Sequence, residues 1–152
     1  MSNSRIRWLE WGKKAFDLAE RFDRPIPLKI GATWCHWCHV MDDTTYSDPA
    51  VIERVNREFI PISVDIDARP DINERYNQGG WPTTAFLTPQ GEIIAGGTYL
   101  PPSNFLEVAN EVLEYYRKNR GRTGDKKHQD FPGGRTGVGD NRGDGRRNHR
   151  YL

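Results

Sequence analysis

The positions of apolar residues predict alternating helices and strands along most of the chain. Residues 5–22 repeat apolar side chains at intervals of three and four, which predicts an amphipathic helix. Residues 24–32 are typical of a short buried strand, and residues 59–67 alternate apolar with other positions, which predicts a strand with one buried face. Residues 103–118 return to helical spacing and begin with Ser103, a residue type that caps helices.

Capping and turn residues predict further elements between these segments. Ser47 or Asp48 is suited to cap a helix that has Pro49 at its first position, where proline is favoured. A Pro-Gln-Gly turn separates two apolar segments, which predicts a β-hairpin. The elements added in this way are helices over residues 47–59 and 69–78 and the hairpin over residues 83–99.

Together with a helix that starts at the cysteine motif considered below, the predicted order of elements is αβααβαββα. A βαβ unit followed by a hairpin and a closing helix predicts an α/β domain, with a central mixed β-sheet flanked by helices on both faces. A thioredoxin fold requires this order of elements.

Composition changes at about residue 120. Residues 120–152 are rich in Gly, Arg and Asp and carry a net charge of +5, whereas residues 1–119 carry −4. A segment with so few apolar residues cannot offset the entropy lost on folding. We therefore predict a folded domain over residues 1–119 and a disordered, basic Gly/Arg-rich tail over residues 120–152. Because the tail has few aromatic residues and also contains acidic ones, we do not expect it to bind nucleic acid.

The N-terminus has no apolar run of the kind that an export signal needs, and no stretch approaches the length of a transmembrane helix. We therefore expect a cytoplasmic protein that does not associate with membranes. Two cysteines in such a compartment do not make a structural disulfide framework. Their expected role is chemical.

Both cysteines lie in the sequence CHWCH, residues 35–39. This spacing matches the C-x-x-C-H signature of covalent haem attachment, but haem attachment normally requires export, and Met1 and Met41 are the only methionines that a distal ligand could come from. A structural zinc site requires four ligands, often from two separated pairs, and only one cysteine pair is present. We therefore expect no metal and no other cofactor.

A redox dithiol accounts for more of the residues in this motif. At the start of a helix, Cys35 lies where unpaired N–H groups and the helix dipole stabilise a thiolate, and Cys38 lies one turn further on, positioned to resolve a mixed disulfide. His39 shares the helix face of Cys35, so a protonated imidazole would lower the pKa of the thiol, although a solvated surface histidine is the alternative. His36 and Trp37, between the cysteines, are expected to tune the reduction potential.

A second candidate segment is GGWPTTAFL, which begins at residue 79. Because the interior of a strand excludes proline, Pro82 is expected at a strand start or in a special turn, and a cis bond is plausible there. In a thioredoxin fold this loop faces the cysteines, so the backbone of Trp81 would bind an extended substrate segment by β-type hydrogen bonds. The alternative is a tight turn with no role in binding.

The motifs described above resemble those of known protein families. Trp34, the two cysteines and the later Pro-Thr pair look like the thioredoxin superfamily. More closely, CHWCHVM, VDIDARPDI, GGWPTTAFLTP and GGTYLPP resemble the thioredoxin-like domain of the spermatogenesis-associated protein 20 family, also called YyaL-type proteins. The segment YSDPAVIERVNREFIPISVDI is also similar to a thioredoxin-like domain of the disulfide reductase DsbD. The resemblance implies Cys35 as nucleophile, Cys38 as resolving thiol and Pro82 as cis-proline.

The chain departs from that resemblance in two ways. Members of the family usually continue into a large helical domain, in place of which this chain has the Gly/Arg tail. Thioredoxins commonly place a buried acid where this chain has Lys29, six residues before Cys35. A partly buried lysine would favour a thiolate by its charge, and a lysine whose amine reaches solvent is the alternative. Asp65 and Asp67, on a neighbouring strand, are candidate substitutes for the acid.

The function expected from these observations is that of an enzyme, a thiol-disulfide oxidoreductase acting as a protein disulfide reductase. Its expected partners are protein disulfide substrates and a cellular thiol reductant that regenerates the dithiol. The alternative is a thioredoxin-fold binding module without turnover, which holds a partner protein or a metal ion through the cysteine and histidine cluster.

Overall fold

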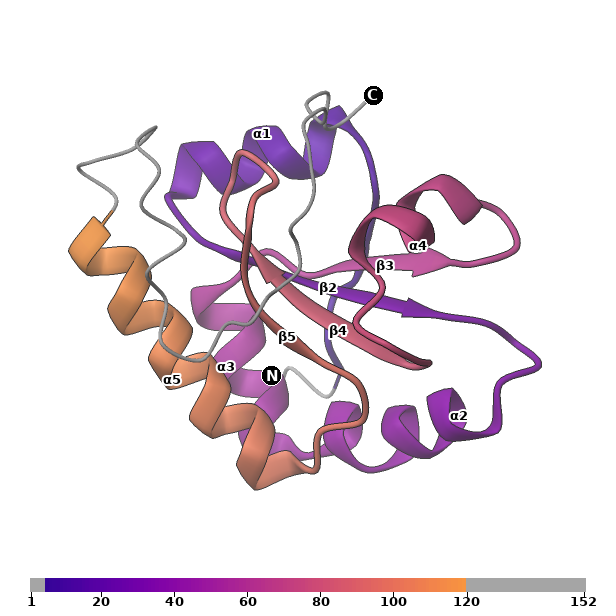
Figure 1. The fold of residues 1–152 in the computed structure, drawn as a ribbon. Helices are drawn as coiled ribbons and strands as arrows, with labels where there is room; N and C mark the ends of the chain where they lie inside the picture. Colours follow the sequence, from indigo (N-terminus) through magenta and orange to yellow (C-terminus); the bar gives the residue numbers. More distant parts are fainter. Residues whose placement is uncertain (1–4, 120–152) are drawn as a thin grey trace.

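The computed structural model describes residues 5–119, so the predicted tail over residues 120–152 lies outside the described residues. Within residues 5–119 the chain forms a mixed β-sheet with helices on both faces (Figure 1). The strands are β1 (Leu9–Glu10), β2 (Ile26–Gly31), β3 (Ile62–Asp65), β4 (Thr83–Leu87) and β5 (Ile93–Gly97). The helices are α1 (Lys13–Phe22), α2 (His36–Asp43), the 3-10 helix η1 (Thr45–Ser47), α3 (Pro49–Glu58), α4 (Pro70–Tyr76) and α5 (Pro102–Asn119).

The sheet has the strand order β1-β3-β2-β4-β5. Strand β3 runs parallel to both β1 and β2, whereas β4 is antiparallel to β2 and to β5. The crossover from β2 to β3 carries α2 and α3, and the hairpin of β4 and β5 completes the sheet. The predicted α/β class with a mixed central sheet is therefore confirmed.

Each face of the sheet has its own apolar core. Helices α1 and α4 cover one face, where Phe16 and Tyr76 pack with apolar residues of β2 and β3. Helices α3 and α5 cover the other face, where Phe105 packs near Phe86 of β4, and Met41 joins this core from α2. The central strand β2 lies between the two cores, so its end is held on both sides. This support fixes the position at which the cysteine motif leaves the sheet.

The helix predicted over residues 5–22 is wrong in its first part, because α1 begins only at Lys13. Before it, Leu9 pairs with Ile62 of β3, so the chain is extended there and forms the edge strand β1. Trp8 and Trp11 fit a helical spacing, but they pack separately, Trp8 against Tyr46 and Trp11 against Phe16. The long-range pairing with β3 overrides the local pattern.

The predicted helix caps are partly corrected. Asp48, one of the two candidates, caps α3 by accepting hydrogen bonds from the backbone N–H groups of Ala50 and Val51 at 3.1 and 3.2 Å. Helix α5 begins at Pro102, so Ser103 lies inside its first turn and is not the cap. The backbone N–H of Phe105 donates to the carbonyl of Pro101 at 2.8 Å, which starts the helix before the predicted position.

Candidate active site

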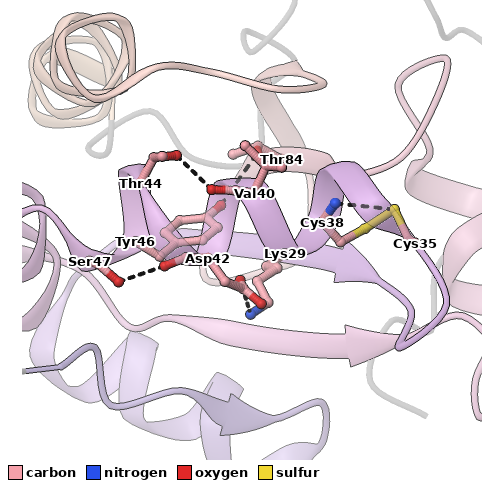
Figure 2. Close-up of polar contacts among 9 residues, drawn as sticks. All are labelled: Lys29, Cys35, Cys38, Val40, Asp42, Thr44, Tyr46, Ser47 and Thr84. Carbon is pink, nitrogen blue, oxygen red and sulfur yellow. Dashed lines mark hydrogen bonds and ion pairs between the residues drawn. A yellow bond between two sulfur atoms is a disulfide. The ribbon is translucent and has the colours of Figure 1, made fainter.

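Strand β2 and helix α2 position the two cysteines. After Gly31 a short loop leads to Cys35, which is the N-cap of α2 with an extended backbone (φ −94°, ψ 113°). The Cys35 sulfur accepts a hydrogen bond from the backbone N–H of Cys38 at 3.2 Å (Figure 2). The first N–H groups of a helix have no partner within the helix, so the sulfur of Cys35 fills the place of a conventional capping oxygen.

The two cysteines form a disulfide and are almost buried, with exposed fractions of 8% for Cys35 and 6% for Cys38. Cys38 lies against Gly31, where a side-chain carbon would stand 3.0 Å from the Cys38 sulfur. The absence of a side chain at Gly31 therefore leaves the space that Cys38 occupies. Cys35 lies nearer the start of the helix, beside the exposed residues of the loop.

Three tryptophans, from the loop before α2, from α2 itself and from the segment before β4, are exposed to solvent. The exposed fractions are 58% for Trp34, 56% for Trp37 and 42% for Trp81. The rings of Trp34 and Trp81 meet edge to face with centroids 5.8 Å apart. Each indole N–H is bonded to a side chain, that of Trp34 to Asp67 and that of Trp81 to Asn73, both at 2.9 Å. These bonds hold the rings in place while their apolar faces remain accessible.

On the helix side of the disulfide, Trp37 contacts both His36 and Tyr99. The ring centroids lie 5.3 Å apart for the first pair and 5.9 Å for the second, and both pairs are edge to face. The Tyr99 hydroxyl lies 3.3 Å from the hydroxyl of Thr44, at the end of α2. We refer to Trp34, Trp37, Trp81 and Tyr99 as the aromatic rim.

The segment before β4 lies beside the cysteine loop, because Trp81 contacts Trp34. The peptide bond between Trp81 and Pro82 is cis, and Pro82 is buried. The side chain of Asn77 organises this segment by accepting hydrogen bonds from the N–H groups of Gly79 and Gly80 at 2.7 and 3.0 Å. Gly79 has a φ of 107°, a conformation that favours glycine. The two motifs singled out in the sequence therefore lie side by side.

The ring of His39 is bonded to the loop that precedes the helix. Its Nε2 lies 2.6 Å from the carbonyl oxygen of Thr33, and because a carbonyl oxygen only accepts, Nε2 carries the proton in this bond. His39 is exposed. The effect of His39 on the Cys35 thiol stays a prediction. The structure adds a second role for His39, because its bond to Thr33 holds the loop between β2 and α2.

Lys29 is paired with an acid that the sequence analysis did not consider. Its Nζ lies 2.9 Å from Oδ1 of Asp42 on α2, and the side chain is only 19% exposed. The ammonium also lies over two aromatic rings, 4.8 Å from the centroid of Trp8 and 5.4 Å from that of Tyr46. The alternative of a lysine that reaches freely into solvent does not match these contacts.

Neither Asp65 nor Asp67, the two candidate substitutes for the thioredoxin acid, is buried beside Lys29. Asp65 is exposed and accepts a hydrogen bond from the N–H of Asp67, and Asp67 is exposed and bonded to Trp34. The signal for Asp42 was present in the sequence, because Asp42 lies four residues after Cys38 and therefore on the same helix face. The partner on the strand was visible only in the folded chain.

Tyr46 closes the inner side of this pair. Its ring is buried, and its hydroxyl lies 3.4 Å from Oγ1 of Thr84 (Figure 2). Burial raises the pKa of the Tyr46 hydroxyl above its ordinary range, the bond to Thr84 partly opposes this, and the charge of Asp42 adds to the rise. Tyr46 is therefore a neutral hydrogen-bonding group beneath α2.

Across residues 5–119, no cluster of three or more His, Cys, Asp and Glu side chains is arranged to hold a metal ion. Within the same residues, no helix is both long enough and apolar enough to cross a membrane.

Several known proteins are similar to this chain in sequence over a small part of their own length. A spermatogenesis-associated protein 20 of Mus musculus is 37% identical over 129 residues, and the human protein of that name is 32% identical over 129 residues. Each alignment covers 76% of this chain but only 16% of the relative. An uncharacterized protein of Caenorhabditis elegans is 40% identical over 111 residues, which are 68% of this chain and 15% of that protein. This chain therefore spans about a sixth of the length of these relatives.

Solved structures establish the thioredoxin-like fold. A thioredoxin from Thermus thermophilus superimposes with a TM-score of 0.66 at 23% identity, covering 80% of this chain and 98% of that one. A DsbH oxidoreductase superimposes with a TM-score of 0.65 at 16% identity, covering 72% and 85%. The sequence profile of one family matches residues 1–131. The chain therefore belongs to that family, Thioredox_DsbH, which is described as proteins of unknown function, DUF255.

Proposed function

We propose that this domain is a thiol-disulfide oxidoreductase that reduces disulfides in proteins. The observation that carries the proposal is the position of Cys35 as the N-cap of α2, where its sulfur accepts the N–H of Cys38. The same N–H and the helix dipole would stabilise a thiolate on Cys35 in the reduced form. Cys38, which forms the disulfide with Cys35, is placed to resolve an adduct on that sulfur.

The reaction proceeds in two exchanges of sulfur bonds. The Cys35 thiolate attacks one sulfur of a substrate disulfide, forms a mixed disulfide and releases the other substrate sulfur as a thiolate. The Cys38 thiolate then attacks Cys35, forms the Cys35–Cys38 disulfide and releases the second substrate thiolate. Two electrons pass to the substrate, and the protons lost by the two cysteines are taken up by the two released thiolates. A cellular dithiol reductant returns the protein to its reduced form.

The aromatic rim and the segment before β4 support binding of an extended polypeptide. Exposed aromatic side chains held by hydrogen bonds are suited to bind apolar side chains of a partner at low entropic cost. The backbone of Trp81, beside Pro82, would pair with a substrate strand by β-type hydrogen bonds. His36 and Trp37 would contact the same segment from the helix side. We place the reaction in the cytoplasm, where thiol systems keep such dithiols reduced.

Trapping of substrates on Cys35 tests the proposal. Reduced protein carrying Cys38→Ser is mixed with insulin, which supplies accessible disulfides, and adducts are resolved by non-reducing electrophoresis. We expect a covalent adduct that dithiothreitol releases, because the mixed disulfide on Cys35 can no longer be resolved. The matched variant Cys35→Ser should trap several-fold less, because the remaining Cys38 lies inside α2 and lacks the N-cap position that would stabilise a thiolate. Equal trapping by the two variants, or none by either, contradicts the proposal.

The reduction potential of the pair gives an independent test. Titration of the metal-free protein against glutathione should show a reversible two-electron couple in the range of thioredoxins or glutaredoxins, roughly −270 to −200 mV. Such a potential would also give the direction of electron flow. A pair that does not form a disulfide reversibly, or that binds stoichiometric metal as purified, would favour a non-catalytic binding module.

A further inference from the structure

We infer that Asp42, held in place by Lys29, accepts the proton of the Cys38 thiol when Cys38 resolves a mixed disulfide. The inference rests on the proposed function and assigns two further residues to the same site. It follows from the way in which β2 and α2 lie against each other.

The strand and the helix place four residues in two adjacent pairs. Lys29 and Gly31 are two apart on β2, so both point to the face covered by α2. Gly31 lies against Cys38, and Lys29 is bonded to Asp42. Residues four apart on a helix have Cβ atoms about 5–6 Å apart, so Asp42 is the neighbour of Cys38 on the same face of α2. Side chains that start from Cβ atoms at this separation can exchange a proton through one bridging water, and Asp42 keeps its bond to Lys29.

Lys29 has little freedom to move away from Asp42. Its side chain is 19% exposed, and the ammonium lies over the rings of Trp8 and Tyr46. In the view of Figure 2, Lys29 and Asp42 lie between Tyr46 and the disulfide. The side chain of Asp42 is 42% exposed. The Lys29 ammonium is therefore held inside the protein, whereas the Asp42 carboxylate is open to solvent, so it can pass the proton to water.

The positive charge of Lys29 supports the thiolate that forms on Cys38. Asp42 becomes neutral when it takes the proton of Cys38, so it no longer offsets the charge of the Lys29 ammonium. The thiolate therefore forms near a positive charge, which stabilises it. Lys29 is therefore a positioning residue, and Asp42 is the group that exchanges the proton.

The other titratable groups around the carboxylate are not suited to accept this proton. Lys29, from β2, already carries its proton in the ion pair with Asp42. Tyr46, from η1, is a phenol whose raised pKa keeps it neutral. His39, from α2 itself, directs Nε2 to the carbonyl of Thr33.

The step is balanced in atoms and electrons. Asp42 takes the proton of the Cys38 thiol, and the resulting thiolate attacks the sulfur of Cys35. The bond between Cys35 and Cys38 forms as the bond between Cys35 and the substrate sulfur breaks. The electron pair of the broken bond leaves with the substrate thiolate, which is protonated from Asp42 or from water.

Stopped-flow reaction of the reduced protein with a dipyridyl disulfide tests the inference. Attack by Cys35 and resolution by Cys38 each release one coloured thiopyridone, so the two steps are seen separately. In Asp42→Asn the first release should keep its rate, whereas the second should slow about 10- to 100-fold at neutral pH, because a positioned base is lost. The difference should shrink as the pH rises and water deprotonates the thiol. Asp42→Glu should restore most of the rate.

The chain offers a matched control pair. Lys13 and Asp17 are also 2.9 Å apart, but they lie on the exposed surface of α1. Lys13→Met and Asp17→Asn should leave both releases unchanged. Lys29→Met should slow the second release by a smaller factor than Asp42→Asn, because the carboxylate remains as the base but the Cys38 thiolate loses the positive charge beside it.

The outcomes separate this inference from the proposed function. An unchanged second release in Asp42→Asn, or equal slowing of both releases, overturns the inference even if Cys38→Ser traps insulin. If Asp42→Asn does not fold, Lys29→Met decides, and an unchanged second release in that variant overturns the inference. Failure of the insulin trap together with the absence of a reversible redox couple would overturn the proposed function itself.

Discussion

Gly31, the last residue of β2, lies directly against the sulfur of Cys38 on α2. A methyl group at Gly31 would stand 3.0 Å from that sulfur, closer than side chains normally pack. We expect Gly31→Ala to lower the free energy of unfolding of the oxidised protein by about 1–3 kcal/mol, the usual cost of overpacking. Urea unfolding measures this change.

Gly97→Ala is the matched control for this substitution. Gly97 also ends a strand, and a methyl group there would meet Leu100 at an ordinary contact distance of 3.5 Å. Its effect should stay within about 0.5 kcal/mol. If the two variants were equally stable, the contact between Gly31 and Cys38 would not limit the packing of α2 on the sheet.

His39→Ala should make Cys35 less reactive near neutral pH. A protonated imidazole near the helix start would lower the pKa of the Cys35 thiol, so removal of the imidazole should slow alkylation about two- to five-fold. The rate of alkylation of reduced protein by iodoacetamide, followed against pH, gives the midpoint of the thiol titration.

His39→Gln separates the two roles of this histidine, because a glutamine amide can still donate to the carbonyl of Thr33 but carries no charge. A midpoint that rises equally in both variants indicates that the charge of His39 lowers the pKa of the Cys35 thiol. A rise in His39→Ala alone indicates that the bond to the loop matters instead. If neither variant moves the midpoint, His39 has no role in activating Cys35.

Trp81→Ala should weaken binding of protein substrates. Removal of an exposed aromatic side chain from a binding surface typically costs about 1 kcal/mol or more, so KM for insulin reduction should rise roughly five-fold or more. The rate with a small dipyridyl disulfide should change less, because that probe does not span the aromatic rim. Phe22→Ala, which removes a 52% exposed aromatic residue from α1, should leave KM unchanged. Equal effects on the large and the small substrate would contradict a role in binding polypeptides.

Tyr46 should make the folded protein less stable in alkali. Burial raises the pKa of Tyr46, so the unfolded chain releases this proton at a lower pH than the folded protein does. The contribution of Tyr46 to stability is therefore complete below the ordinary pKa of tyrosine and is lost as the pH rises from there toward the raised pKa of the folded protein, by up to about 1.4 kcal/mol per pH unit. Tyr46→Phe should remove this part of the slope.

Urea unfolding between about pH 9 and pH 11 measures the slope, a range that brackets the ordinary titration of tyrosine. Tyr99→Phe is the control, because Tyr99 is only partly buried, and it should leave the slope close to that of the unchanged protein. An identical slope in Tyr46→Phe would show that the buried hydroxyl does not titrate differently in the folded and unfolded states.

Local features of the sequence were sufficient to predict most elements and the position of the cysteines. Helical spacing, a cap at Ser47 or Asp48 and Pro49 predicted α3, and the Pro-Gln-Gly turn predicted the hairpin of β4 and β5. The start of α2 at the cysteine motif followed from a strand running into an apolar helical segment. These predictions succeeded because they depend on neighbours within a few residues, which the sequence displays directly.

The tertiary structure decided which distant residues meet at the site. Lys29 pairs with Asp42 across 13 positions, and Trp34 is bonded to Asp67 across 33. The short strand β1 likewise exists because Leu9 pairs with a distant strand. The sequence alone determined the chemical groups available and the local helix that presents the two cysteines. The surroundings of those groups depend on how the strands align and how α2 packs on β2, and local periodicity does not encode that alignment.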